Sequence, residues 1–301
     1  MIEVQDLTKR YGDRLAVDAL SFTVRPGLVT GFLGPNGAGK STTMRMIAGL
    51  DRPTAGRALV NGRPYAEHRA PLREVGLLLE AKAVHTSRSA RDHLRALAAT
   101  HGIDDRRVER LIELAGLREV ARKRAGGFSL GMGQRLGIAA ALLGDPATVI
   151  LDEPVNGLDP EGVLWVRTLL RELAAEGRTV FLSSHLMSEM ALTADHLVVV
   201  GRGRLIADLP VAELTARETT VLVRSPEAAV LTGHLLAEQA TVAAVEQGLL
   251  EVGGLDAAAI GALAHRHGLP LHELTPRRAS LEEAFMELTR DSVEYRAGVA
   301  A

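Results

Sequence analysis

One nine-residue stretch constrains this chain more than any other. Residues 34–42 fit the pattern G-x-x-x-x-G-K-[ST], with an apolar run before them and a helix-compatible run after them, as the motif requires. Its glycines let backbone N–H groups converge, and the following helix adds the positive end of its dipole. The stretch therefore predicts a polyphosphate cradle, with Lys40 at the β- and γ-phosphates and Ser41 holding Mg²⁺. The predicted binding residues here are Gly34, Pro35, Asn36, Gly37, Ala38, Gly39, Lys40, Ser41 and Thr42.

Composition excludes several classes of protein. The 301 residues hold 35 Lys plus Arg against 37 Asp plus Glu, which gives no electrostatic reason to expect nucleic-acid binding. Cysteine is absent, so disulfides, thiol catalysis and thiolate metal sites are excluded. The start at Met1 lacks a secretion signal, and apolar runs such as 136–143 are shorter than the ~20 residues that span a bilayer. We expect a soluble chain that needs a separate membrane partner for any membrane role.

The order of apolar segments predicts an α/β fold. Strand-like and helical runs alternate at 28–50 and again at 148–200, which favours a mostly parallel sheet with helices on its faces. The first 24 residues predict an antiparallel β part. Helical spacing predicts a helical insert at about 81–145, and the Asn-Gly pair within 58–62 predicts a hairpin.

A second, smaller domain follows in the sequence. From about residue 216 the order of elements changes to βαββαβ, which suits a small α+β module of ferredoxin-like type. An amphipathic helix is expected after it, at 281–288. We therefore predict a nucleotide-binding domain at 1–215 and an accessory domain at 216–301.

Two adjacent acids end the apolar strand at 148–151. Asp152 and Glu153 lie where ATPases with such a phosphate loop carry one acid that supports Mg²⁺ and a second that activates water as a general base. An Asp-Glu pair alone is as often a solvated strand end, but the upstream loop favours the chemical role. We assign Asp152 to the metal, together with Ser41, and Glu153 to the base.

Further motifs, in order, resemble the ATP-binding subunits of ABC transporters, over about residues 1–215. Tyr11 lies where that family has an aromatic residue that stacks on adenine. Residues 128–135, Phe-Ser-Leu-Gly-Met-Gly-Gln-Arg, resemble the signature loop that opens a helix. Residues 156–160 resemble the loop after the acidic pair, and 183–185 resemble the segment that ends in the switch histidine. One such match would be weak, whereas several in order are specific.

The resemblance implies a P-loop NTPase fold of the ABC ATPase type, with ATP and Mg²⁺ as cofactors. It also implies a dimer in which two copies close head to tail on two ATP molecules. Ser129 and Gly131 of one copy would cap the γ-phosphate held by the other, and Asp159 would lie at the dimer seam. His185 would contact the γ-phosphate and help fix the water beside Glu153.

These assignments have plainer alternatives when each residue is taken alone. A tyrosine in a turn, such as Tyr11, is often only a packing residue. A histidine at a strand end, such as His185, is more often satisfied by its neighbours than catalytic. The constellation as a whole favours the functional roles, so Glu153, His185 and Lys40 are predicted to be catalytic.

Two positions depart from the family pattern. Leu130 and Met132 replace a glycine and a glutamine of the signature, which makes it similar to the branch associated with antibiotic resistance and with drug or lipid export. Glu80 stands where the family has its Q-loop glutamine. Its carboxylate could ligate Mg²⁺ or bind nucleotide-site water, and it could equally be a solvated acid at a strand end.

The resemblance implies an ATPase that powers a separate integral membrane permease, from the cytoplasmic face of the cell membrane. Its cargo would be a drug, an antibiotic or a lipid-like molecule, and it would be exported. The alternative is an ABC-type ATPase without a membrane partner, with a soluble role in repair, translation or regulation. Residues 277–285 resemble the tail of drug-resistance ATPase subunits, which implies a dimer-stabilising or regulatory role for the last domain.

Overall fold

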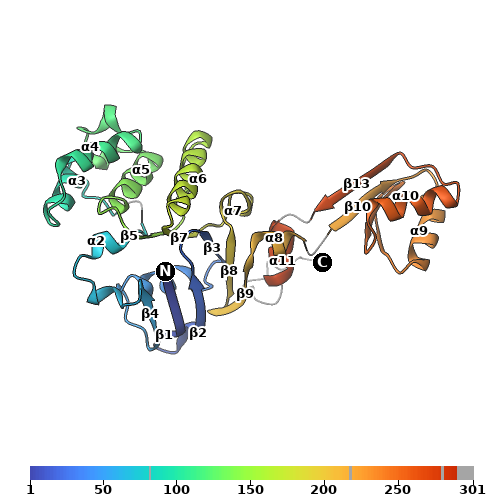
Figure 1. Ribbon diagram of the computed structural model, residues 1–301, viewed down its shortest axis with the longest axis horizontal. Coiled ribbons are helices and arrows are strands. Elements are labelled where there is room, and N and C mark those ends of the chain that lie inside the picture. The colour runs from blue at the N-terminus through green and yellow to red at the C-terminus, as the bar shows by residue number, and fades with distance from the viewer. Residues whose placement is uncertain (81–82, 217–218, 279–280, 290–301) are drawn as a thin grey trace. The chain divides into compact units, whose positions relative to one another are not determined.

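The chain packs as two compact units. The computed structural model describes residues 1–80, 83–216, 219–278 and 281–289. One unit is formed mainly by Met1–Pro210 and the other by Val211–Glu287 (Figure 1). The division into functional domains at 1–215 and 216–301 stays a prediction. Residues 81 and 82, where the predicted helical insert begins, lie outside the described residues.

A six-stranded sheet forms the centre of the first unit. Its strand order is β5-β6-β7-β3-β8-β9, and all neighbours pair in parallel except β8 and β9. Every residue of β3, β6 and β7 is buried, which explains their continuous apolar sequences. The strands are β3 (Val29–Leu33), β5 (Val75–Leu78), β6 (Thr148–Leu151), β7 (Thr179–Ser183), β8 (His196–Gly201) and β9 (Arg204–Pro210).

The predicted N-terminal antiparallel part is a three-stranded sheet in the order β2-β1-β4. Its strands are β1 (Ile2–Tyr11), β2 (Arg14–Val24) and β4 (Ala55–Val60). The hairpin predicted within 58–62 is wrong. β4 pairs with β1 instead, with Ile2 opposite Val60, and the turn at Asn61 and Gly62 leads only to an isolated bridge between Val60 and Arg63. The distant partner wins because β4 can bury Val60 only by joining the sheet that β1 already forms.

Helices cover the central sheet and form the predicted insert. Figure 1 shows α3, α4 and α5 gathered together, away from β1, β2 and β4. α6 packs against β3 and β7. The helices of this unit are α1 (Lys40–Ile47), α2 (Pro71–Glu74), α3 (Ala90–Ala99), α4 (Asp105–Leu114), α5 (Leu130–Ala141), α6 (Pro160–Ala175) and α7 (Met187–Thr193). The fold is thus the predicted α/β architecture with a mostly parallel sheet, an antiparallel part and a helical insert.

Three phenylalanines join the two sheets of the first unit. Phe22 lies on β2, Phe32 on β3 and Phe181 on β7, and their ring centroids are 5.1 to 5.7 Å apart. They belong to one buried cluster with residues of α1, such as Met44. Leu182, the next residue along β7, points to the other face and lines a small cavity with residues of α6. The central sheet is therefore covered on both faces.

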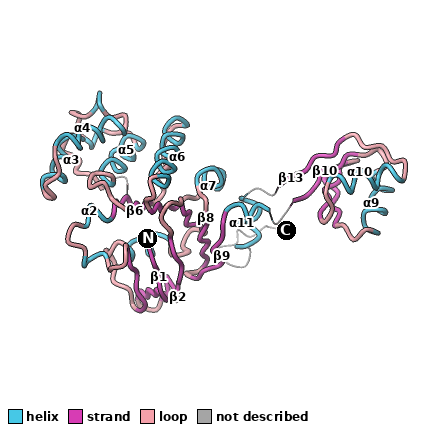
Figure 2. The backbone as a smooth tube through the Cα atoms, in the orientation of Figure 1, coloured by secondary structure: helices cyan, strands magenta, loops and turns pink. Residues whose placement is uncertain are grey.

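The second unit has the predicted βαββαβ order and an antiparallel sheet, β11-β12-β10-β13. Its two main helices share a core with the sheet through Leu231, Leu235, Ile260 and Leu263 (Figure 2). The last strand of this sheet covers Glu273–Arg278. The elements are α8 (Val211–Ala216), β10 (Thr219–Arg224), α9 (Ala228–Ala237), β11 (Thr241–Glu246), β12 (Leu249–Gly253), α10 (Ala257–Arg266), β13 (Glu273–Arg278) and α11 (Leu281–Thr289).

Replacing Phe181 with alanine is expected to destabilise the first unit. The side chain is fully buried and contacts two other rings, so its loss leaves a cavity that costs about 3–5 kcal/mol. Thermal unfolding followed by circular dichroism measures the change. Leu164→Ala is the control, because Leu164 is 56% exposed and should change the unfolding free energy by no more than about 0.5 kcal/mol. Equal effects of the two substitutions would contradict the central position of the cluster.

Candidate nucleotide-binding site

Three parallel strands end at the same edge of the central sheet. β7 lies between β3 and β6, with Phe32 opposite Ser183 and Leu151 opposite Leu182. The segments that leave β3, β6 and β7 are the phosphate loop, the acidic pair and the segment that ends in His185. The pairing of these strands therefore brings together motifs that are far apart in the sequence.

The phosphate loop turns into α1 through a residue that must be glycine. Gly39 has φ of 95°, and a Cβ there would meet the carbonyl of Ala16. Lys40 begins the helix, and its ammonium group donates to the carbonyl oxygens of Gly34 at 2.6 Å and Pro35 at 3.3 Å. Burial lowers the pKa of Lys40, and the nearby carboxylates of the acidic pair oppose that shift. The loop thus holds a lysine charge at its own centre.

The acidic pair is held by hydroxyl groups from both neighbouring segments. The hydroxyl of Ser41 donates to Asp152 Oδ2 at 2.8 Å, and the hydroxyl of Ser183 donates to Asp152 Oδ1. Ser183 Oγ also accepts from the backbone N–H of Glu153 at 3.0 Å. The carboxylate of Glu153 lies 2.6 Å from His185 Nδ1 and accepts the backbone N–H of that histidine at 3.3 Å. Asp152 therefore faces the phosphate loop, and Glu153 faces the histidine.

Most of the predicted binding residues line one cavity of about 580 Å³. The cavity contains the loop from Asn36 to Thr42, Tyr11 and both acids. The ammonium of Lys9 lies 4.9 Å from the ring centroid of Tyr11, and the hydroxyl of Tyr11 donates to Asp51 at 3.1 Å. Within the described part of the chain, the lining is Tyr11, Arg14, Ala16, Asn36, Gly37, Ala38, Gly39, Lys40, Ser41, Thr42, Asp152 and Glu153.

Seven predicted site residues are not part of this lining, namely Gly34, Pro35, Glu80, Ser129, Gly131, Asp159 and His185. Ser129 caps α5, because its hydroxyl accepts the backbone N–H of Met132 at 3.2 Å, and Gly131 lies in the first turn of that helix. Asp159 caps α6 and accepts from Gly162 at 3.0 Å. Glu80 lines a neighbouring groove of about 520 Å³, which Ser41 and Asp152 also border.

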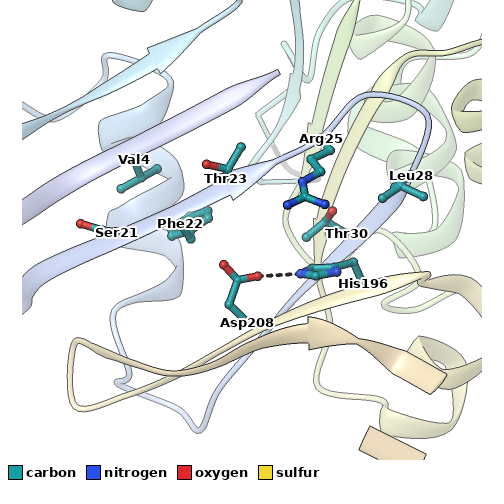
Figure 3. A pocket seen from close by; sticks show the side chains of 9 residues that line it. All are labelled: Val4, Ser21, Phe22, Thr23, Arg25, Leu28, Thr30, His196 and Asp208. Atoms are coloured by element: carbon teal, nitrogen blue, oxygen red, sulfur yellow. Dashed lines mark hydrogen bonds and ion pairs between the residues drawn. The ribbon is translucent and has the colours of Figure 1, made fainter. Parts of the chain in front are cut away.

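A second cavity of about 400 Å³ lies between β2 and the N-terminal ends of β3 and β8. Figure 3 shows Arg25, Thr30 and the pair of His196 and Asp208 around it, and His196 Nε2 is 2.6 Å from Asp208 Oδ1. Thr30 and His196 are at or near the starts of their strands, whereas the phosphate loop follows the end of β3. This cavity therefore lies away from the predicted chemistry.

Sequence reasoning missed residues that hold the site together. Ser183 makes hydrogen bonds to Asp152 and to Glu153, yet the sequence motif indicates it only as part of the segment that ends in His185. Gln134 donates to the backbone of Glu153, although the signature segment gave it no role. Arg14 and Ala16 line the cavity from β2. The available signal for Gln134 was its place inside residues 128–135, whereas the β2 residues gave none.

The fold and the site define a class of protein. A glycine-rich loop that opens a helix, with an acidic pair on a nearby parallel strand, is the arrangement of P-loop nucleoside triphosphatases. Residues 17–156 match the ABC transporter family, and residues 219–282 match a family described only as a domain of unknown function.

Similar proteins support the same assignment. The bacitracin transport ATP-binding protein BcrA of Bacillus licheniformis is 41% identical to the chain, over 74% of each. YhcH of Bacillus subtilis (strain 168), an uncharacterised ABC transporter ATP-binding protein, is 33% identical over 98% of this chain and 97% of its own. A solved ATP-binding subunit of an ABC transporter gives a TM-score of 0.64 at 28% identity, covering 72% of this chain and 92% of that one.

The chain belongs to the ATP-binding subunits of ABC transporters. It binds and hydrolyses ATP, and in this family that reaction powers a separate permease. The resemblance seen in the sequence, including its drug-resistance branch, is confirmed. Within the described ranges, no helix is long and apolar enough to cross a membrane.

Replacing Lys40 with alanine is expected to weaken ATP binding by at least roughly tenfold, because a charge-assisted contact to the phosphates is lost. Titration with a fluorescent ATP analogue measures the affinity. Lys123→Ala removes the same charge from an exposed position in the helical insert and should leave affinity unchanged. Wild-type affinity in Lys40→Ala would remove Lys40 from the phosphate cradle.

Proposed function

We propose that two copies of this chain bind two ATP molecules head to tail and that Glu153 activates the water that attacks the γ-phosphate. The observation that carries the proposal is the contact of Glu153 with His185 beside a cavity that contains the phosphate loop. The side chain of Glu153 is 27% exposed, so water can reach it. A carboxylate that is oriented by a second group suits a general base.

The donor set suits Mg²⁺. The hydroxyl oxygen of Ser41 and a carboxylate oxygen of Asp152 lie 2.8 Å apart at the border of the cavity, and Mg²⁺ prefers such oxygen ligands. Ser41 and Asp152 would hold the cation, and its charge would offset the negative charge of the phosphates. Glu80 lies in the adjoining groove, and we retain it as a candidate that acts on this cation or on nucleotide-bound water. Tyr11 would hold the adenine ring from the other end of the cavity.

The placement of Ser129 and Gly131 supports the paired arrangement. Both lie at the N-terminal end of α5 and outside the cavity of their own chain, so within one chain they have no phosphate to bind. A helix N-terminus with a hydroxyl and a glycine is a suitable phosphate contact for a second chain. In the pair, Asp159 would lie at the seam, next to the same helix end. His185 would complete the contacts to the γ-phosphate.

The groove of about 520 Å³ is our candidate for permease binding. It is largely apolar, and Leu50 on its rim is 54% exposed. A short apolar segment of a membrane protein could bury these side chains and place the ATPase at the cytoplasmic face of the membrane. Because the groove also reaches Ser41 and Asp152, its occupant would adjoin the nucleotide site.

We propose export of a drug, an antibiotic or a lipid-like molecule as the transport that ATP hydrolysis drives. The support is the similarity to BcrA, which is named for bacitracin transport, together with the Leu130 and Met132 form of the signature. An ABC-type ATPase with a soluble repair, translation or regulatory role is not favoured, because the reported relatives carry transporter names. The cargo itself would be recognised by the permease.

Glu153→Gln is expected to lower ATP turnover by roughly 10²–10⁴-fold, the usual contribution of a general base. ATP binding should persist, so gel filtration with ATP and Mg²⁺ should trap a dimer. Glu172→Gln, at an exposed site on α6, should keep wild-type turnover and remain monomeric after hydrolysis. Unchanged hydrolysis in the Glu153 variant would refute the base assignment.

Leu97→Arg is expected to abolish permease binding, because it puts an unpaired charge in an apolar contact. Tagged chain purified from detergent-solubilised membranes should carry a multi-helix membrane protein, identified by mass spectrometry. Leu114→Arg, at an exposed position on α4, should retain that protein. Retention by the Leu97 variant would count against the groove, and absence of any membrane protein would favour the soluble alternative.

A further inference from the structure

α5, the helix that follows the signature loop, contacts Glu153 of its own chain through one buried amide. Gln134 lies on α5 and is only 3% exposed. Its Nε2 donates to the backbone carbonyl oxygen of Glu153 at 2.8 Å. An amide is rarely buried unless its hydrogen bonds are satisfied, so this contact explains why a polar residue can lie between the helix and the sheet edge.

The carbonyl that Gln134 binds belongs to a residue with an unusual backbone. Glu153 has φ of 52°, a left-handed conformation that residues other than glycine seldom adopt. It is held on both sides. Its N–H donates to Ser183 Oγ at 3.0 Å, and its carbonyl also accepts from the N–H of Asn156 at 3.1 Å. This conformation points the carboxylate of Glu153 at His185.

The start of α5 makes further contacts with the loop that follows Glu153. A Cβ at Gly157 would overlap the side chain of Leu130, so that glycine packs directly under the helix end. The guanidinium of Arg135 lies 5.0 Å from the ring of Trp165 and 3.9 Å from Asp159 Oδ1. Among these contacts between α5 and the loop, the hydrogen bond of Gln134 is made to Glu153 itself.

We propose that Gln134 is a positioning residue for Glu153. It connects the start of α5, where Ser129 and Gly131 lie, to the base of the same chain. Ser129 is the N-cap of α5, and Gln134 lies about one turn further along the same helix. A shift of the helix when Ser129 contacts the nucleotide of the second copy would move the amide and therefore the backbone of Glu153. This inference rests on the proposed roles of Glu153 and Ser129.

Gln134→Met tests the amide with little change in side-chain volume. Methionine cannot donate a hydrogen bond, so we expect kcat to fall at least roughly tenfold while KM and ATP affinity stay within about twofold. Steady-state ATPase assays and titration with a fluorescent ATP analogue supply these values, and thermal unfolding monitors the fold. Gln5→Leu is the matched control, because Gln5 on β1 also makes one side-chain hydrogen bond, to Arg57, away from the site.

Gln134→Glu supplies a readout that a packing role would not move. A protonated carboxyl group can donate to the carbonyl of Glu153, whereas the ionised form repels it, and burial favours the protonated form. The ratio of variant kcat to wild-type kcat should therefore rise as the pH falls from 8.5 to 6. The same kcat ratio for Gln134→Met should not change with pH, because the titration of groups that both enzymes share cancels in the ratio.

The outcomes separate this inference from the proposed function. Wild-type kcat in Gln134→Met, with Glu153→Gln inactive, would overturn the positioning role and leave the base in place. A pH-independent ratio for Gln134→Glu would overturn it too, even if Gln134→Met failed to fold. Full turnover in Glu153→Gln would instead remove the proposed function on which the inference rests. A kcat defect with recovery at low pH supports the inference.

Discussion

The site depends on one structural constraint, the parallel pairing of β3, β7 and β6. Parallel neighbours end at the same edge of a sheet, so three segments that are distant in sequence meet there. The contact of Ser41 with Asp152 joins residues 111 positions apart and closes the arrangement. Because these three strands are wholly buried and their register is fixed, the phosphate loop and the acidic pair follow well-packed strands of the sheet.

Through α5, the helical insert connects the sheet edge that carries the acidic pair to the surface where Ser129 lies. α5 has the exposed Ser129 as its N-cap and contacts the backbone of Glu153 through Gln134. The phosphate contact that we propose between two copies would thus lie about one helical turn from a contact inside one copy. This proximity suggests how a dimer could couple its two sites without a long pathway. A permease segment bound in the groove that borders Ser41 and Asp152, as we propose, would have a comparably short route to the site.

The sequence predicted the fold well where the signal was local. The phosphate loop, the fully apolar strands and the helical insert follow from runs of neighbouring residues, and they appear in the structure nearly as expected. The hairpin predicted within 58–62 closes only between Val60 and Arg63, because β4 pairs instead with β1, which lies much earlier in the sequence. β9 was missed, since more than half of its residues are exposed and its sequence lacks a clear apolar alternation.

By itself, the sequence determined the family, the phosphate loop and the acidic pair, because each depends on residues that are close together in the chain. Only the tertiary structure decided which groups orient the acids. Ser183 reaches Asp152 across 31 positions, and Gln134 reaches Glu153 across 19. Such hydrogen bonds need a particular strand order and helix placement. The packing of the whole unit sets both, and no short pattern records them.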